Sequence, residues 1–242
     1  MSNLDSIKID KIGFLDIGNS SIKLGLRKEE HWEIKIFTNA DELTLTLLDD
    51  GMEYLIICNV RSSVKWLEQL SEHFSIAILE TEDIPQQQLR YNTPKTLGMD
   101  RYLACLGAWS MFQSPVVVID SGSACTIDFM DQSAVYHGGV IMPGIRTLLG
   151  VFHKSAPALP QFQFAIPSHF PGVSSKDSLQ WGLSQLFLDG VNSNLNRYDE
   201  LHHNYQLVVT GGDAETLSPL INRDLIVSRD LIFIGMETFL QI

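Results

Sequence analysis

The chain has 242 residues, with 17 Lys and Arg against 29 Asp and Glu, a formal net charge of −12 and 45% hydrophobic residues. This composition is typical of a globular protein and excludes the disordered and fibrous classes. The acidic excess disfavours nucleic acid and anionic membranes as partners, because both are bound through clustered Lys and Arg. An anionic ligand would therefore have to be held by a few local cations and backbone amides.

Targeting and cysteine patterns predict a soluble protein in the cytoplasm. The N-terminal sequence MSNLDSIKIDKIG alternates charged and apolar residues, so we expect no signal peptide. No apolar run approaches the roughly 20 residues that cross a bilayer, so we expect no membrane association. Cys58, Cys105 and Cys125 each lie in an apolar run, which is typical of small buried side chains in a reducing compartment.

The first predicted element is a β-hairpin over residues 12–26, IGFLDIGNSSIKLGL, in which an apolar strand ends at Asp-x-Gly. A further strand is predicted over 54–60, followed by a helix over 64–74 and a strand over 76–79. A longer helix is predicted over about 96–112, where small residues on one face allow another element to approach closely.

The second half repeats this order. Its hairpin spans residues 116–130, VVVIDSGSACTIDFM, and again an apolar strand ends at Asp-x-Gly. The other elements predicted in this half are a helix over about 176–195, a strand over 206–213, a helix over 214–221 and a strand over 231–234.

The repeat predicts a duplicated α/β fold with the order βββαβαβα written twice. The second half also carries an insertion over 136–190 that includes a Pro- and Gly-rich stretch. No low-complexity linker separates the halves, and the helix over 96–112 is the predicted connection. We therefore expect two similar domains, 1–113 and 114–242, which face each other across a cleft.

The turn of the first hairpin has the residue types that hold a polyphosphate. Gly18 would let the backbone approach an oxygen closely, Asn19 and Ser20 supply donors, and Lys23 supplies a compact cation. Asp16 could hold a hydrated magnesium ion. Taken alone, such a turn is more typical of an ordinary hairpin, because Asn and Gly suit tight turns.

A second copy of this turn changes the interpretation. Residues 120–123, Asp-Ser-Gly-Ser, end a strand in the second half, and two facing turns of this kind would clamp the phosphates of a nucleotide. Gly211 and Gly212 lie between a predicted strand and a predicted helix and would offer flat backbone surface to an adenine or a ribose. By itself this last pattern is more typical of helix capping.

Together with these turns, several short motifs resemble the type III pantothenate kinases in order and approximate spacing over nearly the whole chain. That family belongs to the superfamily of acetate kinase, sugar kinases, Hsp70 and actin, whose members grip ATP between two ribonuclease-H-like domains. The resemblance implies that fold and the ATP-dependent phosphorylation of pantothenate to 4'-phosphopantothenate, the first step of coenzyme A biosynthesis. The matching segments are DIGNSSIK (16–23), Tyr91 ahead of Pro94, GMDR (98–101), DSGSA (120–124), GGVIMPG (138–144) and TGG (210–212).

The resemblance also implies roles for single residues. Asp100 would be the catalytic general base, although without the resemblance a helix-capping Asp paired with Arg101 is the favoured interpretation. Asp120 would be linked to a monovalent cation, K+ or NH4+. Ser175 would reach the pantothenate bound in the partner subunit of a homodimer. Ser123 and Ser175 stand where the family usually has threonine. The hydroxyl is retained and a methyl group is lost, so we expect the change to affect ligand affinity more than activity. The implied ATP-binding residues are Asp16, Ile17, Gly18, Asn19, Ser20, Ser21, Ile22, Lys23, Ser123, Gly211 and Gly212, and the implied pantothenate-binding residues are Tyr91, Gly98, Met99, Asp100, Arg101 and Ser175.

Two other functions stay open at this point. A kinase of the same fold could act on another small hydroxylated acceptor, or the chain could be a non-catalytic regulator, because some relatives of the family were first described as accessory factors in transcriptional control. Asp16, Asp100 and Asp120 are all present, which argues against a degenerate regulator. We expect ATP as co-substrate and Mg2+ and a monovalent cation as cofactors.

Overall fold

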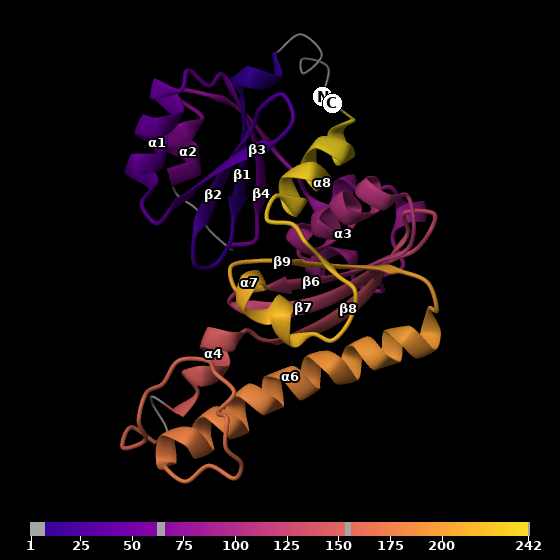
Figure 1. The fold of residues 1–242 in the computed structure, drawn as a ribbon. Helices are drawn as coiled ribbons and strands as arrows, with labels where there is room; N and C mark the ends of the chain where they lie inside the picture. Colours follow the sequence, from indigo (N-terminus) through magenta and orange to yellow (C-terminus); the bar gives the residue numbers. More distant parts are fainter. Residues whose placement is uncertain (1–7, 62–65, 153–155, 242) are drawn as a thin grey trace. The chain divides into compact units, whose positions relative to one another are not determined.

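A computed structural model describes residues 8–61, 66–152 and 156–241, which form two compact units (Figure 1). The first unit contains the chain up to Gln113, Met130–His137 and the stretch from Arg229 onward; the second contains Ser114–Phe129 and Gly138–Ser228. The two domains predicted as 1–113 and 114–242 differ from these units, because Met130–His137 belongs to the first unit. The last helix of the chain also groups with the first unit.

The first unit is built on a five-stranded sheet with the order β3-β2-β1-β4-β5. Strands β1, β2 and β3 are antiparallel neighbours, whereas β4 pairs in parallel with both β1 and β5. This arrangement confirms the hairpin and the two later strands predicted for the first half. The strands are β1 (Ile12–Ile17), β2 (Ile22–Arg27), β3 (Trp32–Phe37), β4 (Tyr54–Asn59) and β5 (Ser75–Ile78).

Helices pack on both faces of this sheet. The predicted helix over 96–112 is confirmed as α3, and the one over 64–74 as the shorter α2, with residues 64 and 65 outside the described part of the chain. The helices of the first unit are α1 (Ala40–Asp49), α2 (Trp66–Leu70), α3 (Met99–Phe112) and α8 (Leu231–Leu240), with short 3-10 turns η2 (Ile9–Lys11), η3 (Thr81–Asp83), η4 (Gln86–Gln88) and η5 (Pro94–Thr96).

Alternation along β1 divides its side chains between the two faces. Leu15 and Ile17 join Leu43 and Leu47 of α1 in one apolar cluster. This face is apolar along β1 and holds the sheet against α1 and α2.

The opposite face of β1 carries Asp16, a candidate site residue. Phe14 meets the ring of Trp32 edge-on at 4.9 Å, and Trp32 stacks on Phe233 of α8 at 5.5 Å. Asp16 follows Phe14 by two residues and therefore shares the face covered by α3 and α8. The aromatic packing thus sets the face toward which the Asp16 carboxylate points.

The prediction of a strand over 231–234 was wrong. Residues Leu231–Leu240 form helix α8, and the strand of this region is β10 (Ile226–Val227). A run of four apolar residues fits a buried strand as well as a buried helix. Helix α8 packs closely along α3 (Figure 1), and Leu231 to Phe233 are all buried, so the sequence shows no polar face at that point to mark a helical period.

The second unit repeats the strand order of the first. Its sheet has the order β10-β9-β6-β7-β8, so the first strand of its hairpin, β6, pairs in parallel with the later strand β9 as β1 does with β4. The hairpin over 116–130 and the strand over 206–213 are confirmed. The strands are β6 (Val116–Ser121), β7 (Ala124–Met130), β8 (Tyr136–Pro143), β9 (Gln206–Thr210) and β10, and the helices are α4 (Ile145–Leu149), α6 (Ser175–Leu201), α7 (Ala214–Leu217) and the 3-10 turn η6 (Ser218–Leu220).

Helix α6, the long orange helix of Figure 1, runs along this second sheet. Phe187, Leu188, Val191 and Leu195 recur at helical spacing and join the apolar core of the unit. The helix confirms and extends the predicted one over 176–195. With the same strand order in both units, the predicted duplicated ribonuclease-H-like fold is confirmed.

Two predictions about the whole chain bear on its chemistry. Cys58, Cys105 and Cys125 are buried, as expected, and none of the three is joined in a disulfide. Among the described helices none combines the length and apolar character that a bilayer crossing requires.

Candidate active site

The first predicted phosphate loop connects β1 to β2. Ile17 and Ile22 are buried and pair with each other where the hairpin closes. Asp16 is only 6% exposed, and Nζ of Lys23 donates to its Oδ2 at 2.9 Å. The ion pair spans the base of the turn, so Lys23 compensates the buried carboxylate from the opposite strand.

The tip of this loop, with Asn19 and Ser20, is exposed. Its backbone is held by Arg61, whose Nε donates to the carbonyl oxygen of Gly18 at 2.7 Å. Arg61 itself is fixed at the end of β4, because its backbone N–H donates to the Asn59 side chain at 3.0 Å. A second cation therefore lies beside the loop, and the sequence analysis did not single it out.

Asp100 is the second residue of α3, and Gly98 occupies the N-cap position. Oδ1 of Asp100 accepts the backbone N–H of Arg101 at 2.9 Å. A side chain at position 98 would collide with that oxygen. Gly98 therefore leaves room for the carboxylate at the start of the helix, where the helix dipole favours negative charge.

The charges of Asp16 and Asp100 both influence one buried thiol of the first unit, that of Cys58. Cys58 of β4 pairs in register with Asp16 of β1. Burial raises the pKa of the Cys58 thiol well above its usual range, and the charges of Asp16 and Asp100 act in the same direction, whereas Lys23 opposes them. The loop carboxylate and the candidate base are therefore in electrostatic reach of the same atom.

Apart from Ser175, the other residues expected to bind pantothenate lie in this unit as well. Arg101 is 8% exposed and Met99 4% exposed. Tyr91 is half-buried, with its ring centroid 6.2 Å from that of Tyr136. The segment before α3 is anchored by a bridge between Leu89 and Tyr136. The motif around Asp100 is thus a packed structure with a cation next to the candidate base.

The second predicted phosphate loop lies between β6 and β7, and its backbone is fixed by the start of α4. The carbonyl oxygen of Ser123 accepts the N–H of Gly144 at 3.1 Å and the hydroxyl of Thr147 at 2.7 Å. A side chain at position 144 would collide with the carbonyl oxygen of Gly122. These contacts hold the loop in place while Ser123 is exposed.

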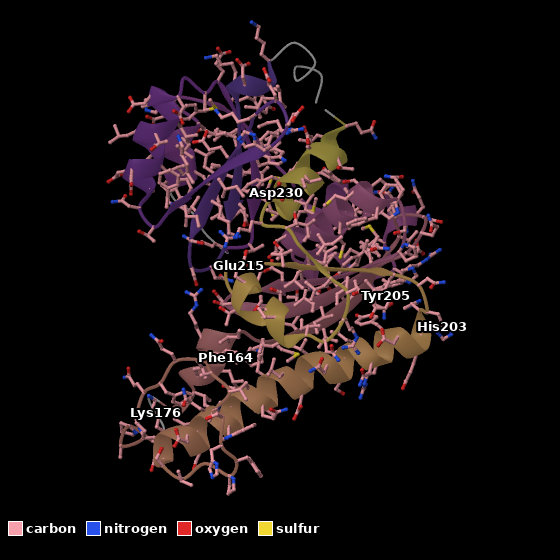
Figure 2. The ribbon with its side chains drawn as sticks, in the orientation of Figure 1. Phe164, Lys176, His203, Tyr205, Glu215 and Asp230 are labelled. Atoms are coloured by element: carbon pink, nitrogen blue, oxygen red, sulfur yellow. The ribbon has the colours of Figure 1, made fainter. Side chains whose placement is uncertain are left out.

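The Gly211–Gly212 turn lies beside Asp120 of the second loop. Thr210 pairs with Asp120 in parallel register, which brings the ends of β9 and β6 together. Gly211 has φ of +92°, and a side chain there would also collide with Oδ1 of Asp120, so glycine is required at this point. Helix α7, which carries Glu215 in Figure 2, follows the turn.

An ion pair that the sequence analysis did not anticipate closes this turn. Nε and Nη2 of Arg146 donate to Oδ1 of Asp213 at 3.1 and 2.8 Å. Asp213 is 8% exposed, whereas 75% of the Arg146 side chain is exposed. The backbone N–H of Asp213 donates to the carbonyl oxygen of Ser121 at 2.9 Å, so the turn and the second loop are tied together.

Carboxylates gather around the second loop. Burial raises the pKa of Cys125 to about 12, and Asp120, Asp128 and Asp213 act in the same direction. The segments 114–129 and 206–213 contain no Lys or Arg. The surroundings of the second loop are therefore negative apart from the charge that Arg146 supplies.

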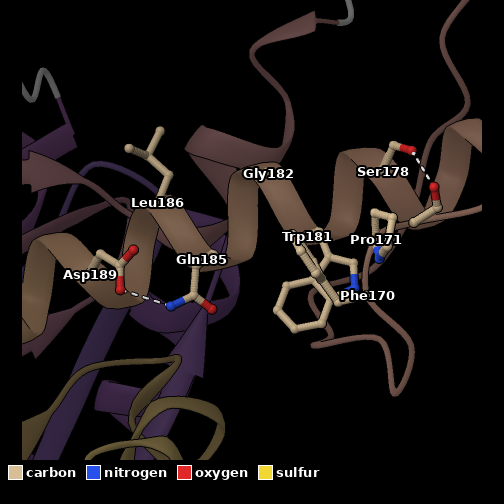
Figure 3. A pocket seen from close by; sticks show the side chains of 9 residues that line it. Phe170, Pro171, Ser178, Trp181, Gly182, Gln185, Leu186 and Asp189 are labelled. Carbon is tan, nitrogen blue, oxygen red and sulfur yellow. Dashed lines mark hydrogen bonds between the residues drawn. The ribbon is translucent and has the colours of Figure 1, made fainter.

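Ser175 is the first residue of α6 and is exposed, while Ser174 caps the helix by accepting the backbone N–H of Asp177 at 3.1 Å. A groove of about 590 Å³ lies along this end of the helix (Figure 3). Phe170 and Leu186 line it and are 74% and 59% exposed. Ser175 thus lies on a part of the second unit that presents apolar surface to solvent.

The structure brings the predicted residues together within each unit. Asp16, Lys23 and Asp100 gather in the first, and Asp120, Ser123 and the Gly211–Gly212 turn gather in the second. Sequence reasoning missed three charged residues that contact these loops. A sequence signal existed for Asp213, which directly follows the Thr-Gly-Gly motif, but none marked Arg61 and Arg146, whose contacts are long-range in sequence.

Comparison with known proteins identifies relatives over most of the chain. The family model of type III pantothenate kinase matches residues 14–197. A type III pantothenate kinase of Flavobacterium johnsoniae is 27% identical over 245 aligned residues, which cover 94% of this chain and 96% of that protein.

Solved structures show the same fold. A Campylobacter jejuni protein described as a conserved member of the Baf family of transcriptional activators superposes with a TM-score of 0.65 and 24% identity, covering 95% of this chain and 97% of that one. A 2-dehydro-3-deoxygalactonokinase protein from Sinorhizobium meliloti gives a TM-score of 0.63 with 13% identity, covering 95% of this chain and 98% of that one. At these identities the likeness establishes the fold alone.

Proposed function

Because the chain belongs to the type III pantothenate kinase family, we propose that it transfers the terminal phosphoryl group of ATP to pantothenate. The product is 4'-phosphopantothenate, and the reaction is the first step of coenzyme A biosynthesis. The observation that carries the proposal is the family match over residues 14–197, which contains Asp16, Asp100 and Asp120. Asp16 pairs in register with Cys58, and the charges of Asp16 and Asp100 both act on that thiol, which supports a proton acceptor near the loop that binds the phosphates.

Asp100 is the proposed general base. It accepts the proton of the attacking hydroxyl as the oxygen bonds to phosphorus, a role that contributes about two to four orders of magnitude in rate. The hydrogen bond from the N–H of Arg101 orients Oδ1 of this carboxylate. Arg101, permanently charged and largely buried, binds the carboxylate of pantothenate, and Tyr91 packs along its apolar part.

The proposed ATP-binding residues are found in each of the two units. Residues 16–23 and Ser123 hold the phosphates, and Gly211 and Gly212 supply the backbone surface for the nucleoside. Glycine at these turns allows the close approach that a bulky phosphate chain needs.

Mg2+ is the divalent ion that accompanies ATP. The side chains of the first loop fit it only as an ion that keeps most of its water ligands. In the described part of the chain no group of three or more His, Cys, Asp or Glu side chains is arranged to hold a metal ion. Mg2+ commonly keeps several waters and uses one or two carboxylates together with substrate phosphates. Asp16 would hold the ion in this way, through one of its bound waters. When bound, the ion neutralises charge on the phosphates, and Lys23 then balances whatever negative charge remains at Asp16.

Asp120 is the residue proposed to bind K+ or NH4+. The carboxylates near Cys125 supply the negative charge that attracts a monovalent cation. Such a cation would offset the negative field of this loop, which otherwise opposes an incoming polyphosphate.

We also propose a cytoplasmic homodimer in which Ser175 of one subunit contacts pantothenate in the other. The apolar groove on α6, with Phe170 and Leu186 exposed, supports an interface at this end of the second unit. Exposed apolar surface of this kind is typical of a protein-protein contact.

A coupled ADP-release assay tests the proposed function. We expect ADP release that depends on pantothenate, and no comparable turnover with a panel of sugars and polyols. Turnover of a sugar or polyol instead of pantothenate would reassign the substrate within the same fold. A folded protein that releases no ADP with any acceptor would favour the regulatory alternative. The Campylobacter jejuni protein of the Baf family shares the fold of this chain, and this likeness says nothing about a regulatory role.

A further inference from the structure

The Arg146–Asp213 pair differs from an ordinary surface ion pair in how unevenly its members are buried. Both hydrogen bonds from the guanidinium go to Oδ1 of Asp213. Oδ2 is buried and has no hydrogen-bond partner among the described residues. A buried carboxylate with one oxygen unpaired is costly unless a cation compensates it, so Asp213 strongly favours the bound position of Arg146.

The guanidinium is held at a place where the two turns of the second unit meet. Its Nη2 lies 3.4 Å from where a side chain at Gly212 would begin. The next residue, Thr147, donates to the carbonyl oxygen of Ser123 in the second phosphate loop. Arg146 therefore lies beside the Gly211–Gly212 turn, and the residue that follows it is bonded to the second phosphate loop.

Arg146 retains donors for a ligand. A guanidinium has five N–H groups, and Asp213 uses two of them, so three stay available on a side chain that is 75% exposed. Because Asp213 already fixes the guanidinium, binding an anion costs less side-chain entropy than it would for an untethered arginine. The loops themselves supply no Lys or Arg to balance Asp120 and Asp213.

We propose that Arg146, positioned by Asp213, binds the phosphates of ATP at the second loop. This inference rests on the proposed kinase function and adds a nucleotide-binding residue and a positioning residue to it. Arg146 donates hydrogen bonds to phosphate oxygens while it keeps its two bonds to Asp213. Asp213 acts only through Arg146.

The test compares Arg146→Gln with Arg223→Gln in steady-state kinetics and equilibrium binding. Arg223 also pairs with a carboxylate of the second unit, Asp199 at 2.9 Å, so its variant removes the same charge from a pair outside both loops. We expect Arg146→Gln to raise KM and Kd for MgATP about tenfold and to leave the Kd for adenosine and the KM for pantothenate unchanged. Arg223→Gln should match wild type in all four values.

Asp213→Asn and the double variant test the positioning role. If Asp213 acts through Arg146, Asp213→Asn weakens MgATP binding less than Arg146→Gln does, and the double variant binds no more weakly than Arg146→Gln. Arg146→Lys should recover part of the affinity, because it restores the charge without the paired donors.

The outcomes separate this inference from the proposed function. Wild-type protein without pantothenate-dependent ADP release would refute the kinase function itself. Active wild type together with unchanged MgATP affinity in Arg146→Gln, even if the melting temperature falls, would overturn the role of Arg146. An equal loss of adenosine and MgATP binding would also overturn it, as would a rise in KM for pantothenate alone.

Discussion

Gly107 of α3 and Gly235 of α8 lie against each other, so that a side chain atom added at Gly107 would sit 2.9 Å from the backbone nitrogen of Gly235. An added side chain at Gly235 would in turn collide with the carbonyl oxygen of Leu103. The two helices therefore touch backbone to backbone. This contact positions α3, whose first turn carries Asp100.

Gly235→Ala is expected to destabilise the first unit, because the obstructing atoms are backbone and cannot move aside as a side chain would. Overpacking of this kind costs about 1 to 3 kcal/mol. Thermal unfolding should show a lower melting temperature. Gly182→Ala in α6 is the matched control, since an added side chain there meets no atom within 4 Å, and it should be neutral or slightly stabilising. Equal melting temperatures for wild type and Gly235→Ala would contradict the close helix contact.

Asp100→Asn should slow turnover by about two to four orders of magnitude, because the amide keeps the size of the carboxylate but cannot accept the proton. ATP affinity and melting temperature should stay close to wild type. Oδ1 of the amide can still accept the N–H of Arg101. Turnover, nucleotide binding and thermal unfolding measured on one preparation check this. Turnover within a few-fold of wild type would remove Asp100 as the base.

Activity should depend on K+ or NH4+. Asp120 lies among carboxylates that act together on Cys125, so a bound monovalent cation would relieve the negative field near the phosphates. Replacing K+ by Na+ or tetramethylammonium at constant ionic strength should lower turnover. The same turnover in all three salts would exclude a specific cation site.

The shared dimer site predicts complementation between two inactive variants. Asp100→Asn removes the base from one subunit, and Ser175→Tyr blocks the contact that the other subunit makes. Each homodimer should be inactive, but a mixed dimer has one site with both native residues. After subunit exchange of equal amounts, activity should reach about a quarter of wild type, because about half of the dimers are mixed. Mixtures that stay inactive, although exchange is demonstrated by mass, would argue against the contact through Ser175.

The second unit contains a carboxylate that should make stability fall in acid. Partial burial tends to raise the pKa of Asp199, but hydrogen bonds from Tyr205, labelled in Figure 2, and from Arg223 outweigh it, so the pKa lies below its usual range. A lowered pKa in the folded state contributes stability above the unfolded value of about 4, and this is lost as pH falls through the folded value.

The melting temperature of wild type should therefore fall further between about pH 5 and pH 3 than that of Asp199→Asn. Glu200→Gln, which removes an exposed carboxylate from the same helix, should follow wild type. Parallel acid profiles for wild type and Asp199→Asn would show that the ion pair adds no stability.

The two hairpins, their loops and the strands β4, β5 and β9 were predictable because their signals are local, whereas β3 was not predicted and β8 was placed in the insertion over 136–190. Each hairpin combines an apolar strand with Asp-x-Gly, and the copy at Asp120 repeats the one at Asp16. The run Leu231–Ile234 was misassigned because a helix buried along α3 shows no polar face there and its neighbour lies more than a hundred residues away in sequence. Arg61 and Arg146 were missed for a related reason: their partners, Gly18 and Asp213, are 43 and 67 residues distant.

Helix α8 groups with the first unit although it is the last element of the described chain. During synthesis, the second unit therefore has all of its strands and helices before α3 acquires its partner. Until residues 231–240 are synthesised, Gly107 lacks the backbone and Trp32 lacks the Phe233 ring that pack against them in the folded unit. The packing of α3, the helix that carries Asp100, therefore depends on a segment made after the whole second unit, and a chain stopped shortly before residue 231 would leave this helix without its partner.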